Sequence, residues 1–314
     1  MIQKITFCLL LICSLSAISQ DDLLDLVKEE PKNEPAKKVY ATFKTTKIVS
    51  AQSIETVKKR NLDFRVTHRF GNIYNSLSPN ALNEAAHGYF GLDNATDIRI
   101  SFDYGITDDI TIGIGRSKYR EMYDGTFKWR FLTQKEGNSI PVSVCFYGNA
   151  GYTSMTTDNL YAGTIRPKTN EAHRLQYCSQ LLIARKFNNS LSLQLMPTYV
   201  HRNFIKQQLN TNNGKEDENG LFSLGIGGRI KLTKRFALVA DYFYNFSEFQ
   251  TKNPTPYYNA LSAGIEIETG GHVFHINFSN SPAILESSML TTTQDTWTNG
   301  QIKLGFNISR WFAF

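Results

Sequence analysis

The stretch "DIRISFDYGITDDITIGIG", residues 97–115, decides the expected fold of this chain. Apolar side chains occupy every second position from Ile98 to Tyr104 and again from Ile110 to Ile114. A period of two residues is that of a β-strand whose two faces meet different surroundings. Only "GITDD" separates the two alternating runs, which predicts a tight turn between antiparallel neighbours.

The same alternation recurs from residue 62 to residue 314, and this region lacks the pattern of a long amphipathic helix. It predicts an all-β domain of twelve strands. The expected strands cover 62–70, 97–104, 110–115, 125–131, 141–151, 174–186, 191–203, 220–232, 236–247, 258–268, 271–279 and 300–314. No run after Gln20 approaches the ~20 apolar residues of a membrane-spanning helix. If the chain enters a membrane, it must therefore do so as a closed barrel.

Longer and shorter connections alternate between these strands. Long ones cover 71–96, 152–173 and 280–299, whereas "FNN", "TKR" and "TGG" are short. A moderate connection, 116–122, is followed by a short one around "TQKEGNSI". An even strand number with short turns at one end and long loops at the other predicts an up-and-down transmembrane β-barrel of the outer-membrane type. A soluble β-sandwich also has amphipathic strands, but it gives no reason for connection lengths to alternate.

The second face of the expected strands is polar and carries charges of both signs. In a membrane barrel the apolar face meets lipid and this polar face lines the lumen. The lumen-lining candidates are Asp63, Arg65, Asp97, Arg99, Asp103, Lys128, Arg130, Asp241 and Glu266. Mixed signs predict ion pairs inside the barrel rather than selectivity for one sign of charge. Twelve strands enclose less space than large porins do, so a narrow channel or a plugged barrel is expected.

The beginning of the chain has the features of an export signal. Lys4 is followed by an apolar run from Ile5 to Leu15, and "SAIS" places small residues before Gln20. The next residues are charged and include two prolines, which favours a flexible linker. The expected organisation is a signal peptide over 1–19, a linker over 20–39, a periplasmic or plug segment over 40–60, and the barrel over 61–314.

The connection 71–96 is long enough to carry a function of its own. One hypothesis is that part of it folds into the barrel mouth, with Asp93 and Asn94 near Arg99. The alternative is a loop that lies in solvent. Cys145 and Cys178 remain after removal of the signal peptide, and either a disulfide or two free thiols is compatible with their positions.

The sequence gives no sign of catalytic chemistry. The glycines of "GIGIG" alternate with isoleucine and precede no helix, so they do not form a phosphate-binding turn. The six histidines do not form a recognisable site, and no catalytic residue, cofactor or metal site is expected. A lipid-modifying enzyme within the membrane, with His201 acting beside a loop serine, is the least favoured alternative.

Two stretches resemble a known family. "DFRVTHRFGNIYNS", residues 63–76, and "YFGLDNATDIRISFDYGITDDITIGIGRS", residues 89–117, are similar to a family of uncharacterised β-barrel proteins from Gram-negative bacteria, defined as a domain of unknown function. The resemblance extends from about Thr42 to Phe314. It implies an exported outer-membrane barrel, and it implies neither a substrate nor catalytic residues.

The best functional prediction is a narrow pore, or a barrel that binds or transports a small solute, without catalysis. The alternative is an accessory barrel that docks a periplasmic protein through residues 21–60. The expected location is the outer membrane, with lipid and the barrel-assembly machinery as partners. The net charge of +6 is modest and the basic residues form no block, which argues against nucleic-acid binding.

The chain ends with "GQIKLGFNISRWFAF", residues 300–314, an alternating strand with an aromatic last residue. It is expected to close the barrel against the first strand, with Phe312 and Phe314 acting as the assembly signal. We predict that deleting Phe314 reduces the amount of folded barrel in the membrane, measured as the fraction of unheated protein that migrates anomalously in a detergent gel. Normal insertion of the shortened chain would contradict this role.

Overall fold

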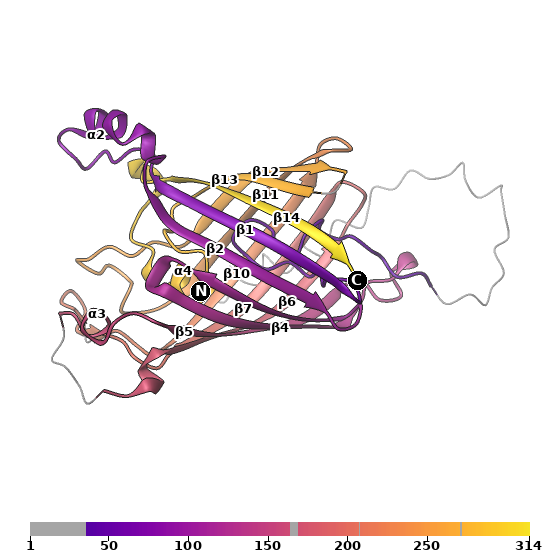
Figure 1. Cartoon of the computed structure of the whole chain (residues 1–314), viewed down its shortest axis with the longest axis horizontal. Coiled ribbons are helices and arrows are strands. Elements are labelled where there is room, and N and C mark those ends of the chain that lie inside the picture. The colour runs from indigo at the N-terminus through magenta and orange to yellow at the C-terminus, as the bar shows by residue number, and fades with distance from the viewer. Residues whose placement is uncertain (1–35, 164–168, 207, 271) are drawn as a thin grey trace. The chain divides into compact units, whose positions relative to one another are not determined.

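The computed structural model describes residues 36–163, 169–206, 208–270 and 272–314. The expected signal peptide, 1–19, and most of the expected linker, 20–39, lie outside these residues. From Lys37 onward the chain forms one compact unit, a closed β-barrel with tilted strands (Figure 1).

Twelve antiparallel strands form the wall, and each is hydrogen-bonded to a neighbour on both sides. They are β1 (Asn61–Asn72), β2 (Ala95–Gly105), β3 (Ile110–Ser117), β4 (Met122–Leu132), β5 (Ser143–Thr153), β6 (Leu175–Lys186), β7 (Leu191–Arg202), β10 (Gly220–Lys231), β11 (Phe236–Phe246), β12 (Leu261–Thr269), β13 (His272–Ser279) and β14 (Lys303–Ala313). The prediction of a twelve-stranded, up-and-down barrel is confirmed, with strand ends that differ by a few residues.

The other elements are short and lie in the connections. They are the helices α2 (Ala81–His87), α3 (Thr157–Leu160) and α4 (Glu286–Thr292), the single turns η2 (Tyr89–Gly91), η3 (Tyr119–Glu121), η4 (Glu136–Asn138), η5 (Glu171–Arg174) and η6 (Trp297–Asn299), and the pair β8 (Leu209–Asn210) and β9 (Lys215–Glu216). Within the described ranges, none of these helices has the length and apolar character needed to cross a membrane.

The last strand closes the barrel against the first, as its alternating pattern predicts. Leu62 of β1 lies opposite Phe312 of β14, and Val66 lies opposite Ile308. The backbone N–H of Phe314 donates to the carbonyl of Arg60 at 3.0 Å. The ring of strands is therefore complete, and the wall has no open sheet edge.

The two faces of the wall differ as a period of two requires. Asp63 and Arg65 point inward and are 0% and 1% exposed. Ile114 and Trp129 point outward and are 67% and 48% exposed. A soluble protein would bury its apolar face instead, so this distribution fits a wall surrounded by lipid.

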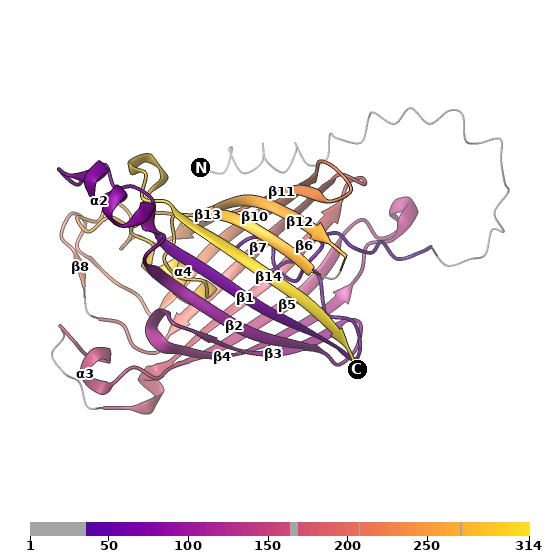
Figure 2. The same ribbon diagram turned by 45° about the horizontal axis from the view of Figure 1, so that its top comes forward.

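The connections at the two ends of the barrel differ in length. The end at which β1 begins and β14 finishes, here called the turn end, carries the short connections 106–109, 187–190 and 232–235. The opposite end, here called the loop end, carries the long connections 73–94, 154–174 and 280–302. Figure 2 shows α2, α3 and β8 together at the loop end, away from the C-terminus.

One hairpin departs from the predicted alternation. Strands β3 and β4 are joined at the loop end by residues 118–121 alone, whereas β4 and β5 are joined at the turn end by the longer stretch 133–142. The predicted lengths were wrong here. The longer stretch provides partners for the incoming chain, because Val39 N–H donates to the Gln134 carbonyl and Glu136 N–H donates to the Lys37 carbonyl.

Inward-facing glycines make room for the polar contacts inside the wall. A Cβ added at Gly113 would lie 1.9 Å from Asp103 Oδ1 and 2.5 Å from Thr126 Oγ1. Gly125, on the neighbouring strand, faces outward and has open space where its Cβ would lie. The two glycines therefore form a matched pair with opposite surroundings.

We predict that Gly113→Val destabilises the folded barrel by about 1–3 kcal/mol, because the added side chain overlaps packed polar groups. Gly125→Val, the control, should leave stability nearly unchanged. The measurement is the temperature at which each variant loses its anomalous gel migration. Equal transition temperatures for the two variants would show that the lumen around Gly113 is loosely packed.

Candidate functional site

A segment of chain ahead of β1 lies inside the barrel. Residues 42–57, here called the plug, are buried except for Lys44 and Glu55, and they lead through Arg60 into the first strand. The plug folds back on itself, because Ile48 N–H donates to the Ala51 carbonyl and Ser53 N–H donates to the Thr46 carbonyl. This turn forms the tip of the plug.

The tip of the plug is bound by Asp241 of β11. The Oδ2 atom of Asp241 accepts the backbone N–H groups of Val49, Ser50 and Ala51 at distances of 2.9–3.0 Å. Consecutive backbone N–H groups that converge on one point form a cradle for an anion. Here the anion is a carboxylate of the wall, so one buried charge fixes the position of the tip.

A lysine of β4 also binds the plug. Lys128 Nζ donates to the carbonyl oxygens of Thr46, Ser53 and Glu55 at 2.9–3.1 Å. A buried ammonium group is stable only when its donors are satisfied. The plug supplies all three acceptors.

A third contact involves β1. Arg65 pairs with Asp63 at 3.0 Å, and both side chains also hydrogen-bond Thr46 Oγ1. Three of the lumen-lining candidates, Asp63, Arg65 and Lys128, thus contact the same turn of the plug. The plug therefore supplies hydrogen-bonding partners to charged side chains of the wall.

A second segment enters the lumen from the loop end. Residues 281–293, which include α4, are buried except for Pro282 and Thr292. Glu286 of α4 pairs with Lys47 of the plug at 3.0 Å and accepts a hydrogen bond from Gln52 at 2.9 Å. Burial raises the pKa of Glu286, but the Lys47 ammonium, a backbone hydrogen bond and the charge of Arg99 together outweigh burial and lower it. The plug and α4 therefore meet through an ionised pair within the barrel.

The connection that contains α4 is also bound by the wall. Asp97 Oδ2 accepts the backbone N–H of Ile284 at 2.9 Å. Arg69 donates to the Ser281 carbonyl at 3.1 Å and to Ser50 of the plug at 2.9 Å. One arginine thus connects β1 to both inserted segments.

The remaining candidates contact residues outside the predicted lumen-lining set. Arg99 pairs with Asp124 at 2.6 Å, and Asp103 accepts a hydrogen bond from Thr126 at 3.2 Å. Towards the turn end, Arg130 pairs with Asp109 at 3.0 Å and with Glu55 of the plug at 3.7 Å. Glu266 pairs with Arg229 and His275, at 2.7 Å and 3.4 Å.

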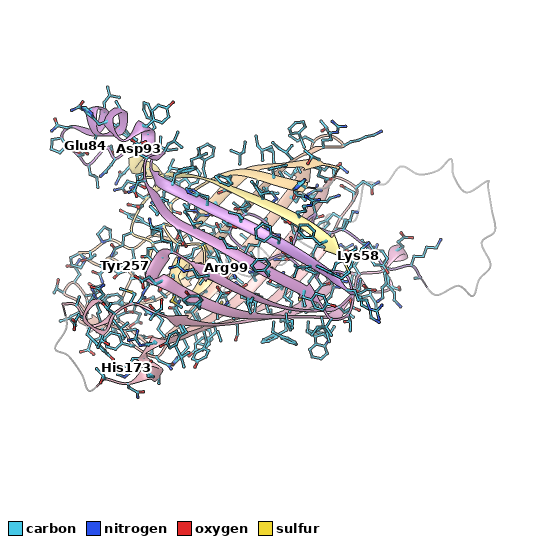
Figure 3. The ribbon with its side chains drawn as sticks, in the orientation of Figure 1. Lys58, Glu84, Asp93, Arg99, His173 and Tyr257 are labelled. Carbon is cyan, nitrogen blue, oxygen red and sulfur yellow. The ribbon has the colours of Figure 1, made fainter. Side chains whose placement is uncertain are left out.

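The hypothesis for connection 71–96 was wrong. Asp93 and Asn94 are exposed, and α2 projects from the rim of the barrel, away from Arg99 (Figure 3). The carboxylate beside Arg99 belongs to Asp124 instead. The plug and the α4 connection already fill the space that this loop was expected to occupy.

Within the described residues, the two C-terminal phenylalanines and the two cysteines take no part in these polar contacts of the plug. Phe312 and Phe314 are exposed on the outer surface, and the Arg310 guanidinium lies 4.9 Å from the centre of the Phe312 ring. Their role in assembly stays a prediction. Cys145 and Cys178 are buried and form no disulfide.

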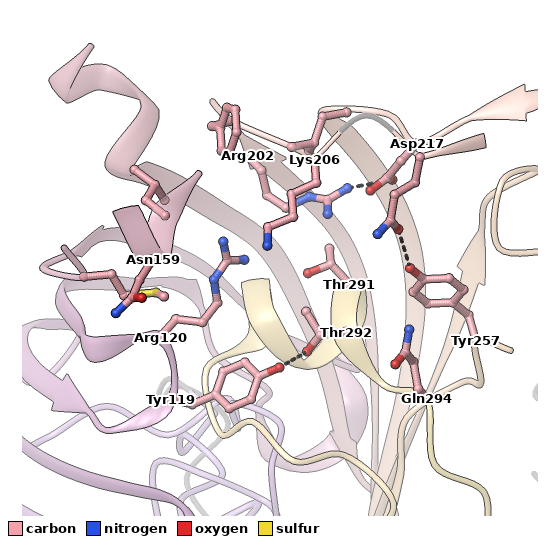
Figure 4. Close-up of a pocket in the computed structure, with 15 residues that line it drawn as sticks. Tyr119, Arg120, Asn159, Arg202, Lys206, Asp217, Tyr257, Thr291, Thr292 and Gln294 are labelled. Atoms are coloured by element: carbon pink, nitrogen blue, oxygen red, sulfur yellow. Dashed lines mark hydrogen bonds and ion pairs between the residues drawn. The ribbon is translucent and has the colours of Figure 1, made fainter. Parts of the chain in front are cut away.

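Two cavities lie at opposite ends of the inserted segments. The first, here called the vestibule, measures about 320 Å³ and lies at the loop end (Figure 4). It is lined by residues that include Tyr119, Arg120, Arg202, Lys206, Tyr257, Thr292 and Gln294. The second measures about 640 Å³ at the turn end and is lined by residues that include Phe43, Lys44, Glu55, Arg130 and Trp311. An internal cavity beside Lys47 measures only about 10 Å³, close to the space of one water.

Residues 43–312 match a family model described as "Membrane bound beta barrel domain (DUF5777)". The chain belongs to this family. The family match confirms the resemblance seen in the sequence. The matched region of the membrane-bound β-barrel domain begins at Phe43, and so includes nearly all of the plug as well as the wall.

The solved structures to which this chain is similar include two porins and an outer-membrane protein. The NanC porin has a TM-score of 0.47 at 8% identity, covering 81% of this chain and 100% of its own. The KdgM porin has a TM-score of 0.41 at 7% identity, covering 81% and 99%. Omp33 of Acinetobacter baumannii has a TM-score of 0.38 at 8% identity, covering 83% and 100%. Comparison with curated proteins found no significant match.

Sequence reasoning missed three central residues of this membrane-bound barrel domain. Arg69 shares the inward phase of Asp63 and Arg65, so the period of two in β1 contained the necessary signal. Lys47 and Glu286 lie in irregular segments, 239 residues apart, and no spacing rule connects them.

We predict that Asp241→Ala loosens the plug, because three backbone N–H groups lose their buried acceptor. Leaving them unsatisfied should cost about 3 kcal/mol. Hydrogen exchange of residues 49–51 should then be roughly 100-fold faster, measured by mass spectrometry on the folded barrel. Glu266→Ala is the control, because Glu266 is a buried wall carboxylate that pairs with Arg229 and His275 rather than with the plug. Unchanged protection in Asp241→Ala would mean that the carboxylate does not hold the tip.

Proposed function

We propose that this protein is an outer-membrane barrel for the passage or binding of a small solute, without catalysis, and that the plug controls passage. Membership of a membrane-bound family and the apolar outer face of the wall support this proposal. In our proposal the turn end faces the periplasm, as in barrels with short periplasmic turns and long outer loops. The observation that carries the proposal is the plug, which is held between two cavities by hydrogen bonds, ion pairs and apolar contacts.

The plug is bound strongly enough to keep the barrel closed at rest. Ile48, Val49 and Ile54 are buried in an apolar cluster that includes Met196 and Phe243 of the wall. Each such side chain contributes about 1.5–3 kcal/mol when buried, so the three together contribute about 5 kcal/mol or more. At about 5 kcal/mol, roughly one barrel in several thousand would be open spontaneously. Opening therefore requires work.

A partner protein could supply that work by binding the chain ahead of the plug. Residues 37–39 are bonded to the turn 133–142, Lys38 lies 3.8 Å from Asp109, and Tyr40 is 66% exposed. These contacts are few and lie near the surface, so they would yield before the plug does. We propose that a periplasmic partner engaging the part of residues 21–60 that precedes the plug releases the plug. This joins the pore and the docking alternatives in one mechanism.

The arrangement of the histidines favours binding over catalysis. The His68 ring stacks on Phe306 on the outward face, and His275 pairs with Glu266 inside the wall. His201 lies 3.4 Å from the Tyr199 hydroxyl. Among the described residues, none of these three has a serine or cysteine side chain at hydrogen-bonding distance, as a nucleophile activated by a base would require.

A disulfide between the plug and the wall provides the test. Ser50 Oγ of the plug lies 2.8 Å from Ser262 Oγ of β12, so Ser50→Cys/Ser262→Cys should form a cross-link when oxidised. In planar bilayers, a barrel lacking residues 42–57 should show steady unit conductance, whereas the wild type should rarely open. The oxidised double variant should lose even the rare openings of the wild type, and a reductant should restore these openings.

Two controls separate gating from damage. Removing residues 78–88, which form the exposed loop around α2, should leave conductance low, because this loop lies outside the lumen. Each single cysteine variant should behave as the wild type does with and without reductant. If the barrel lacking 42–57 migrates as a folded protein yet conducts nothing, the pore function is overturned.

A further inference from the structure

The vestibule contains more positive charge than the described residues neutralise. Arg120, Arg202 and Lys206 line it, and Asp217 is the one carboxylate in the same lining. Arg202 pairs with Asp217 at 2.9 Å and donates to the Glu218 carbonyl at 2.7 Å. Asp217 therefore already pairs with Arg202, and Arg120 and Lys206 have no carboxylate partner in this lining.

Those two groups are poorly compensated. Lys206 Nζ donates to the Ala162 carbonyl at 2.6 Å, which uses one of its three donors. Across the described ranges, the Arg120 guanidinium makes neither a hydrogen bond nor an ion pair. In Figure 4 the charged ends of Arg120 and Lys206 point into the same space from opposite sides. Burial lowers the pKa of Arg120, Tyr119 offsets part of this effect, and the nearby charge of Arg202 adds to the lowering.

Arg120 is held in place by an unusual turn. Arg120 and Glu121, between β3 and β4, have left-handed φ values of 53° and 47°, which are costly for residues other than glycine. Thr153 Oγ1 donates to the Arg120 carbonyl at 2.5 Å, and Ser154 N–H donates to the Glu121 carbonyl at 3.1 Å. The backbone that carries this guanidinium is thus fixed by the neighbouring strand, at a cost in strain.

The rest of the vestibule suits an organic molecule rather than a bare ion. Tyr119, Phe204 and Tyr257 provide aromatic surface, and Thr291, Thr292 and Gln294 provide polar groups on the floor. Tyr119 donates to Thr292 Oγ1 at 3.1 Å, which ties the turn of Arg120 to α4. A volume of about 320 Å³ is at the small end of the range for ligand pockets.

We propose that the vestibule binds a small organic anion, in which a carboxylate or phosphate lies between Arg120 and Lys206 and a ring or hydroxylated body contacts the aromatic walls. Guanidinium and ammonium groups bind both kinds of anion through short, charge-assisted hydrogen bonds. This inference names the solute class of the proposed function and rests on that function only for the solute's route, because binding itself does not require the plug to move.

The test uses probes that differ by one charged group. Isothermal titration on the full chain, folded in detergent, should detect glucose 6-phosphate or glucuronate, and glucose should bind at least tenfold more weakly. The phosphate and the carboxylate are separate arms, and whichever binds more tightly identifies the preferred anion. Arg120→Gln and Lys206→Gln should each weaken binding about tenfold, as expected for the loss of a charge-assisted hydrogen bond.

Arg116→Gln is the matched control. Arg116 lies four positions from Arg120, is exposed on the outward face and contacts the Tyr123 ring rather than the vestibule. It removes the same charge from the same hairpin, so unchanged binding there assigns the effect to the vestibule. Equal binding of glucose and its charged derivatives, failure of both charged sugars to bind, or unaltered affinity in Arg120→Gln and Lys206→Gln would overturn the proposal.

The same titration on the oxidised Ser50→Cys/Ser262→Cys barrel separates this proposal from the gating proposal. Binding that persists in the locked barrel supports the vestibule site whether or not the barrel conducts. A conducting barrel that binds neither charged sugar would retain the pore and remove the anion site.

Discussion

The structure depends on one constraint, which is that every backbone N–H and carbonyl group inside a membrane must find a partner within the protein. The wall meets it by joining β14 to β1, so that each strand has two neighbours. Closure has a second effect, because alternate side chains must then point into an enclosed space. Part of that space is lined by an apolar cluster and part by charged side chains, and these charges need partners that lipid cannot provide.

The plug and the α4 connection supply those partners. Asp241 accepts three backbone N–H groups of the plug, Lys128 donates to three of its carbonyl groups, and Arg69 donates to both inserted segments. If either segment left, each of these charges would need water instead. The polar part of the lumen permits that exchange, whereas the apolar cluster around Met196 and Phe243 does not offer water hydrogen-bonding partners.

Repetition along the chain explains how much of the fold was predictable. A period of two residues located all twelve strands, their inward faces and the closing role of residues 300–314, since each depends on local pattern and strand order. Irregular segments carry no such signal, so the connection 71–96 was wrongly assigned to the mouth and the partners of Lys47 and Glu286 were not found. Loop length misled as well, because 133–142 is extended to pair with Lys37 and Val39, which lie far away in sequence.

The contact between β14 and the plug has a consequence for assembly of the barrel. The plug precedes β1, while the strand that completes the wall is the last to be synthesised, and Asn307 of that strand donates to the Val49 carbonyl at the plug tip. Bringing such distant segments together is entropically expensive and slow. Closure and plug docking thus share contacts in the same late step. An assembly intermediate that lacks β14 would have an open seam rather than a sealed ring, and it would also lack this contact with the plug tip. The order of segments in the chain therefore couples closure of the wall to the docking of its plug.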